Sequence, residues 1–104
     1  MGKKVIDDET EYLFRGILTL KTVEDCRAFF EDLCTVKELS EMSRRLTAAK
    51  MLDGNKIYNE IAEETGLSTA TISRVNRSLS YGCDGYQVVF DRVKDEGKDE
   101  GKAE

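Results

Sequence analysis

Apolar residues recur at helical spacing along most of this chain, and most of these runs begin after a capping residue or end at a glycine. This alternation of amphipathic segment and stop signal predicts helices rather than strands. The predicted helices span residues 9–20, 22–33, 35–53, 56–65 and 69–80. One further run, 86–93, is strand-like, but a lone strand has no partner, so we expect a short final helix there. The sequence therefore predicts an all-α, multi-helix bundle.

The ends of the predicted helices carry specific capping signals. Thr35 and Glu38 form a capping box, in which each side chain can bind the backbone amide of the other residue. Gly54 is expected to end that helix in a left-handed conformation, and Asn55 is expected to cap the next one. Gly66 should stop this next helix in the same way.

The amino-acid composition argues against a membrane protein, a zinc protein and an enzyme. The chain has 104 residues, of which 39% are hydrophobic and 36% charged, and no apolar run approaches the roughly 20 residues that span a bilayer. There is no histidine, and Cys26, Cys34 and Cys83 lack the spacing of a zinc site. We expect a cytoplasmic protein that contacts no membrane, binds no metal or cofactor and has no catalytic residues, so it is not an enzyme.

The expected organisation is one helical domain followed by a tail. Residues 1–93 are predicted to form a single domain that contains a helix-turn-helix at about 56–80. Residues 94–104 read KDEGKDEGKAE, a repeated polar unit that buries too little apolar surface to offset its ordering entropy. We expect this segment to be a disordered polar tail.

Charge is distributed unevenly. The net charge is −5 overall, but it is +1 over residues 35–79, and residues 67–83 contain two arginines and no acid. An acidic total argues against coating nucleic acid by charge alone. A small basic face remains compatible with it, because salt screens charges beyond about 8–10 Å.

The window 58–77, YNEIAEETGLSTATISRVNR, meets the requirements of a helix-turn-helix. Ala62 supplies the small residue where the two helices cross, and Gly66 follows four positions later in the turn. Ser68 can cap the second helix. The residues expected to fill the shared inward face are Ile61, Leu67, Ile72 and Val75.

The second helix would turn a row of hydroxyl and guanidinium groups outward. Such groups suit a DNA major groove, because arginine binds guanine and small side chains contact bases or phosphate. The predicted contacts to double-stranded DNA are Ser68, Thr69, Ala70, Ser73, Arg74, Asn76 and Arg77. In the alternative interpretation, Arg74 and Arg77 lie on a solvated face and pair with the acidic cluster at 60–64.

The stretch from Thr35 to Leu79 resembles the tryptophan repressor family, most closely its TrpR-like YerC/YecD branch. The similarity lies in SRRLTAAKMLDGNKIYNEIAEETGLSTATISRVNRSL, with ATISRVNRSL as its most specific part. The resemblance implies an all-α fold, a homodimer intertwined through the N-terminal helices, and a transcriptional regulator. Two recognition helices of such a dimer would meet successive major grooves about 34 Å apart.

The resemblance also suggests an effector pocket. In tryptophan-binding members the indole lies between two arginines that match Arg44 and Arg74, and a threonine matches Thr35. The glycine that makes room for the ring is replaced by Val75, and added volume in a packed site costs about 1–3 kcal/mol. We therefore do not expect tryptophan as co-repressor, and any small-molecule effector stays unidentified. Arg44 has an alternative role in binding phosphate or forming an ion pair.

A second functional class stays open at this point. A dimeric module could keep the helix-turn-helix scaffold and bind protein instead of DNA, and the acidic total favours this alternative slightly. A third hypothesis is a switch gated by a metabolite.

Overall fold

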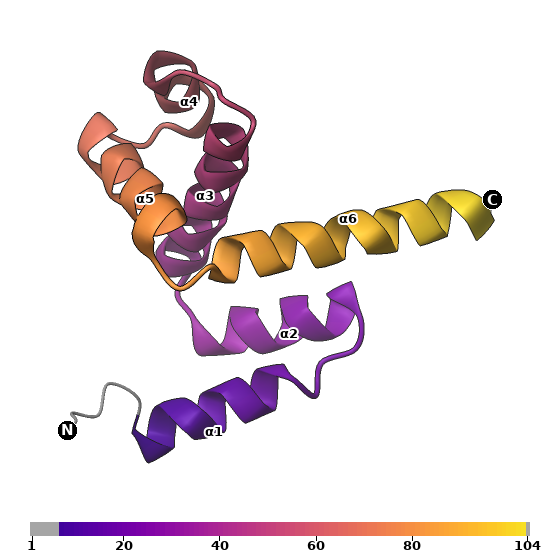
Figure 1. The fold of residues 1–104 in the computed structure, drawn as a ribbon. Helices are drawn as coiled ribbons and strands as arrows, with labels where there is room; N and C mark the ends of the chain where they lie inside the picture. Colours follow the sequence, from indigo (N-terminus) through magenta and orange to yellow (C-terminus); the bar gives the residue numbers. More distant parts are fainter. Residues whose placement is uncertain (1–6, 104) are drawn as a thin grey trace. The chain divides into compact units, whose positions relative to one another are not determined.

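A computed structural model describes residues 7–103, with side chains through Lys94, and this part of the chain contains six helices and no strand (Figure 1). The helices are α1 (Asp8–Ile17), α2 (Val23–Leu33), α3 (Val36–Asp53), α4 (Tyr58–Thr65), α5 (Thr69–Tyr81) and α6 (Gly85–Ala103). The all-α prediction is thus confirmed. Among residues 7–103, no helix combines the length and the apolar character that a membrane crossing requires.

Side-chain caps explain why several helices begin where they do. The Thr35 hydroxyl accepts from the Glu38 amide at 3.0 Å, and the Glu38 carboxylate accepts from the Thr35 amide at 2.9 Å. The predicted capping box of α3 is therefore present, and it satisfies amides that have no partner inside the helix. The Ser68 hydroxyl accepts from the amide of Thr71 at 3.1 Å and caps α5 as expected.

The turn between α3 and α4 differs from the prediction. Asn55, not Gly54, adopts the left-handed conformation, with φ of 66°. The Lys56 amide donates to the Met51 carbonyl at 3.0 Å, and the Asn55 amide donates to the Leu52 carbonyl at 2.9 Å. This is a Schellman motif with asparagine at the left-handed position, a role that asparagine fills when glycine does not. The prediction that Asn55 caps α4 is wrong for this reason.

The residue preceding α4 is Ile57, whose amide donates to the Glu60 carboxylate at 3.4 Å. Isoleucine has no polar side-chain atom, so only this half of a capping box is possible. Ile57 is 61% exposed, and it lies before the first turn of α4, outside the helical periodicity of that helix.

The final helix is longer than predicted. The expected helix over 86–93 is present, but α6 continues to Ala103 and takes in most of the segment 94–104 for which we expect a disordered tail. The segment has no proline and is rich in lysine and glutamate, which have good helix propensity.

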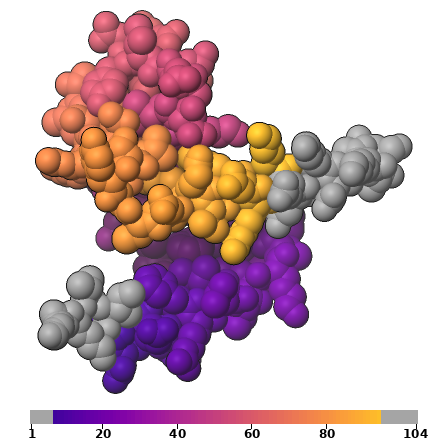
Figure 2. Space-filling view, in the orientation of Figure 1, coloured from indigo at the N-terminus to yellow at the C-terminus, as the bar shows by residue number. Residues whose placement is uncertain are grey.

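The chain divides into two compact units, residues 1–39 and 40–104. The single domain over residues 1–93 stays a prediction. Neither α1 nor α2 contains a buried residue. The unit 40–104 contains the hydrophobic core, to which α4 and α5 both contribute and where they contact each other. Figure 2 shows the surface of the two helices side by side.

This core joins α3 to the two shorter helices that follow it. Ala48 of α3, Ile61 of α4, Leu67 of the turn and Ile72 of α5 are buried together. Val75 of α5 is also buried, as expected. The predicted helix-turn-helix therefore has its own apolar centre, and this centre fixes which face of α5 points outward.

Candidate nucleic-acid interface

The turn between α4 and α5 is held by one glycine and one buried threonine. Gly66 has φ of +76°, and its amide donates to the Ala62 carbonyl at 2.8 Å. The buried Thr65 hydroxyl donates to the Ile61 carbonyl at 2.7 Å and accepts from the Leu67 amide at 3.2 Å. These bonds satisfy polar groups inside the turn and give α5 a fixed direction relative to α4.

An open hollow of about 480 Å³ lies on the outward face of α5. The residues around it are Ala70, Ser73, Arg74, Asn76, Arg77, Ser80 and Tyr81. Five of these seven belong to the set that the sequence predicts to contact DNA. Helical spacing thus brings most of the predicted contacts together on one surface.

Two arginines carry the charge of this surface. No acidic residue is among those around the hollow. Within the part of the chain that the structure describes, neither Arg74 nor Arg77 forms an ion pair, whereas Arg45 pairs with Glu41 at 3.8 Å. The alternative in which both arginines pair with the acidic cluster at 60–64 is therefore not realised in this structure. Both guanidinium groups keep all of their donors for another partner.

The other predicted contacts lie apart from the hollow. Ser68 uses its hydroxyl twice at the start of α5, since it accepts from the Thr71 amide and donates to the Thr71 hydroxyl at 3.1 Å. Thr69 is exposed beside it at the first position of the helix. Both residues lie at a helix N-terminus, where free amides and the dipole favour a phosphate.

Asn76 is placed differently from the prediction. The sequence periodicity puts it on the exposed face, but it is half-buried, and its Nδ2 donates to the Tyr58 hydroxyl at 3.2 Å. The bond connects α5 to α4 across 18 positions of the sequence. Residue spacing along one helix cannot predict a partner on another helix.

Sequence reasoning missed Ser80 and Tyr81, which complete the border of the hollow. Tyr81 is 87% exposed at the end of α5. The signal that could have found it is its spacing, because it follows Arg77 by four residues and so shares its helical face.

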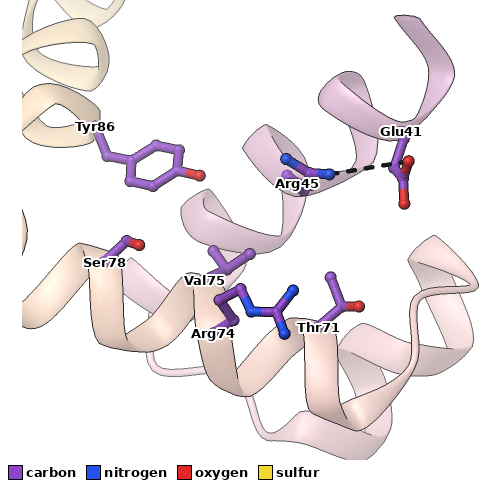
Figure 3. A pocket seen from close by; sticks show the side chains of 7 residues that line it. All are labelled: Glu41, Arg45, Thr71, Arg74, Val75, Ser78 and Tyr86. Atoms are coloured by element: carbon purple, nitrogen blue, oxygen red, sulfur yellow. Dashed lines mark ion pairs between the residues drawn. The ribbon is translucent and has the colours of Figure 1, made fainter. Parts of the chain in front are cut away.

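Arg74 also lines a separate cavity of about 180 Å³ (Figure 3). It is lined by Glu41, Arg45, Thr71, Arg74, Val75, Ser78 and Tyr86. Figure 3 shows Tyr86 of α6 on one side of the cavity and Arg45 of α3, paired with Glu41, on the other side. The cavity is therefore bordered by α3, α5 and α6 within the unit 40–104.

This cavity contains only part of the effector set suggested by the resemblance. Arg74 lines it, but Arg44 does not, and the neighbouring residue Arg45 does. Thr35 uses its hydroxyl to cap α3. Among the described residues, no group of three or more Cys, Asp and Glu side chains is arranged to hold a metal ion.

The comparisons with known proteins agree with this fold. The family model described as Trp repressor protein matches residues 8–94. The chain is 49% identical over 92 residues, 88% of each protein, to the uncharacterized protein YerC of Bacillus subtilis.

Two solved structures are also similar. A TrpR-like protein from Eubacterium eligens has 52% identity and a TM-score of 0.81, with coverage of 85% of this chain and 91% of the other. A structure from Staphylococcus aureus has 48% identity and a TM-score of 0.80, over 85% and 88%. Together with the family match, these likenesses show that the chain belongs to the Trp repressor family, in the TrpR-like branch that includes YerC.

Proposed function

We propose that this protein is a DNA-binding transcriptional regulator that reads a duplex with the outward face of α5. The observation that carries the proposal is the row of Ser73, Arg74 and Arg77 around one open hollow, which has no acidic residue in its lining and whose two arginines form no ion pair among the described residues. Arginine donors in this arrangement can bind guanine edges and phosphates. The family is one of regulators, so we propose no catalytic role. The proposed site of action is the cytoplasm.

We further propose that the regulator acts as a homodimer. In the unit 40–104, an apolar groove of about 640 Å³ between α3 and α6 includes Leu46, Met51 and Val89. In the other unit, Leu18 and Val23 are 82% and 68% exposed. Apolar faces of this extent in a small chain favour association, and a two-fold dimer would present two copies of α5 to one duplex.

Within this proposal, tryptophan is not required for DNA binding. Val75 of α5 is buried, and its side chain lines the same cavity as Arg74. An indole beside Arg74 would compete with this side chain for space, and overpacking of this kind is destabilising. A different small molecule that fits beside Arg45 and Arg74 is the remaining effector hypothesis. A thermal-shift screen tests it, since a ligand that binds the folded state raises the melting temperature.

The test of the proposed contact face is substitution of both arginines. Arg74→Ala/Arg77→Ala should weaken binding to a duplex selected by the parent protein by about 1–3 kcal/mol for each arginine that reads a base. The matched control is Arg27→Ala/Arg92→Ala, which removes the same charge from exposed positions on α2 and α6. If both double variants bind like the parent, the assignment of this face to DNA is wrong.

Salt dependence provides a second readout of the same face. Each phosphate that the protein neutralises contributes about −0.9 to the slope of log K against log salt. The slope of Arg74→Ala/Arg77→Ala should therefore be shallower than that of the parent, while the slope of Arg27→Ala/Arg92→Ala stays unchanged.

The alternative function, a module that binds protein, predicts a different result. Such a module would enrich no duplex from a random pool.

A further inference from the structure

Asn76 lies between two environments. On one side its Nδ2 donates to the Tyr58 hydroxyl at 3.2 Å, and on the other it borders the open hollow with Ser73 and Arg77. An asparagine amide has one acceptor oxygen and two N–H donors. The bond to Tyr58 uses one donor and leaves the carbonyl oxygen and the second N–H for another partner.

Tyr58 is well suited to hold this amide. Its ring packs against the buried cluster of Ala48, Ile61, Leu67 and Ile72, so the core restrains the position of the ring. Its hydroxyl at the ring's end accepts from Asn76. Tyr58 is the first residue of α4, at the end of that helix away from the turn that leads to α5, and its hydroxyl contacts Asn76 in the middle of α5. The hydroxyl is therefore a fixed point on one helix that orients a side chain on the other.

We infer that Tyr58 is a positioning residue for DNA recognition, which holds the Asn76 amide so that its free oxygen and second N–H read an adenine edge. Adenine is the base for which an amide has matching groups, because it offers a donor at N6 and an acceptor at N7. Without the Tyr58 hydroxyl the amide would rotate between orientations, and only some of these match the base. The inference rests on the proposed function and names one part of its specificity.

The test compares Tyr58→Phe, Asn76→Ala and the double variant by selection from a random duplex pool and by titration. Tyr58→Phe removes only the hydroxyl and keeps the ring in the core. We expect both single variants to lose preference at the same A·T pair and to keep the other positions of the motif. Affinity for the parent's duplex should fall about 2- to 10-fold in each, the range for loss of one hydrogen bond. The double variant should bind no more weakly than Asn76→Ala, because the hydroxyl acts only through the amide.

The control is Tyr12→Phe, which removes one hydroxyl from an exposed tyrosine of α1 and should leave the motif unchanged. A purely structural role of Tyr58 would lower affinity for all duplexes equally and preserve the base preferences, which would overturn the inference. Loss of preference at a G·C pair, or an unchanged motif in Tyr58→Phe, would overturn it as well. These results leave the proposed function intact, whereas a parent that enriches no duplex overturns both.

Discussion

At the scale of single residues, the direction of α5 depends on the backbone of Gly66. Its φ of +76° lies in the left-handed region, and it is the only glycine with positive φ in the described part of the chain. A side chain at this position would be strained even though an added Cβ meets no atom within 4 Å. Gly54, by contrast, ends α3 without a positive φ, because Asn55 takes that conformation.

Gly66→Ala should therefore destabilise the protein by about 1–2 kcal/mol, the cost of placing a Cβ in the left-handed region. Urea denaturation measures this change in the free energy of unfolding. Gly54→Ala is the matched control, because its added Cβ would meet the Met51 carbonyl oxygen at an ordinary contact distance of 3.5 Å. It should be neutral or slightly stabilising. Equal effects of the two substitutions would contradict the assignment of the left-handed position.

Residues also differ in how far sequence alone could place them. Gly66 and the buried Val75 follow from local spacing, and both predictions are confirmed. Asn55 was harder to place, because Gly54 and Asn55 are adjacent and both suit a left-handed turn. The position of Asn76 depends on Tyr58 of another helix, and a pattern within one helix carries no information about that contact.

At the scale of elements, caps determine where α3 and α5 begin. Each cap is a contact between residues three positions apart, Thr35 with Glu38 and Ser68 with Thr71, so sequence was sufficient to predict it. The length of α6 was not predictable in the same way. Its polar end has helix propensity but no apolar stripe, and these two signals favour different states.

Removing the α3 cap should have a measurable cost. Thr35→Ala eliminates the acceptor for the Glu38 amide, and loss of a cap costs about 0.5–2 kcal/mol. Thr35→Ser keeps a hydroxyl and should retain most of the stability. Thermal unfolding followed by circular dichroism compares the three proteins. An alanine variant as stable as the parent would show that the capping box contributes nothing to folding.

At the scale of the whole molecule, many large apolar side chains of the described residues are exposed to solvent in the single chain. Neither helix of the unit 1–39 that precedes α3 buries a residue, and Leu46 of α3 and Val89 of α6 are 43% and 44% exposed. Small domains bury a limited share of their surface, so association is a common way to cover the remainder. The spacing of residues within each helix does not specify which of these faces the proposed dimer would cover.

Sedimentation equilibrium should therefore give twice the chain mass of 11.8 kDa. Leu46→Glu/Val89→Glu places two charges in the apolar groove between α3 and α6 and should shift the protein toward monomer. Ile57→Glu, at an exposed apolar position outside that groove, is the control and should remain dimeric. A parent protein that sediments as a monomer at micromolar concentration would contradict the dimer proposal.

Selection from a random duplex pool with the purified parent protein tests the central claim most directly. If two copies of α5 read DNA, the enriched sequences should contain a two-fold symmetric motif with half-sites about one helical turn apart. The same selection with Arg74→Ala/Arg77→Ala should yield a weaker or altered motif. A pool that remains random after selection by the parent would contradict the account and favour a module that binds protein.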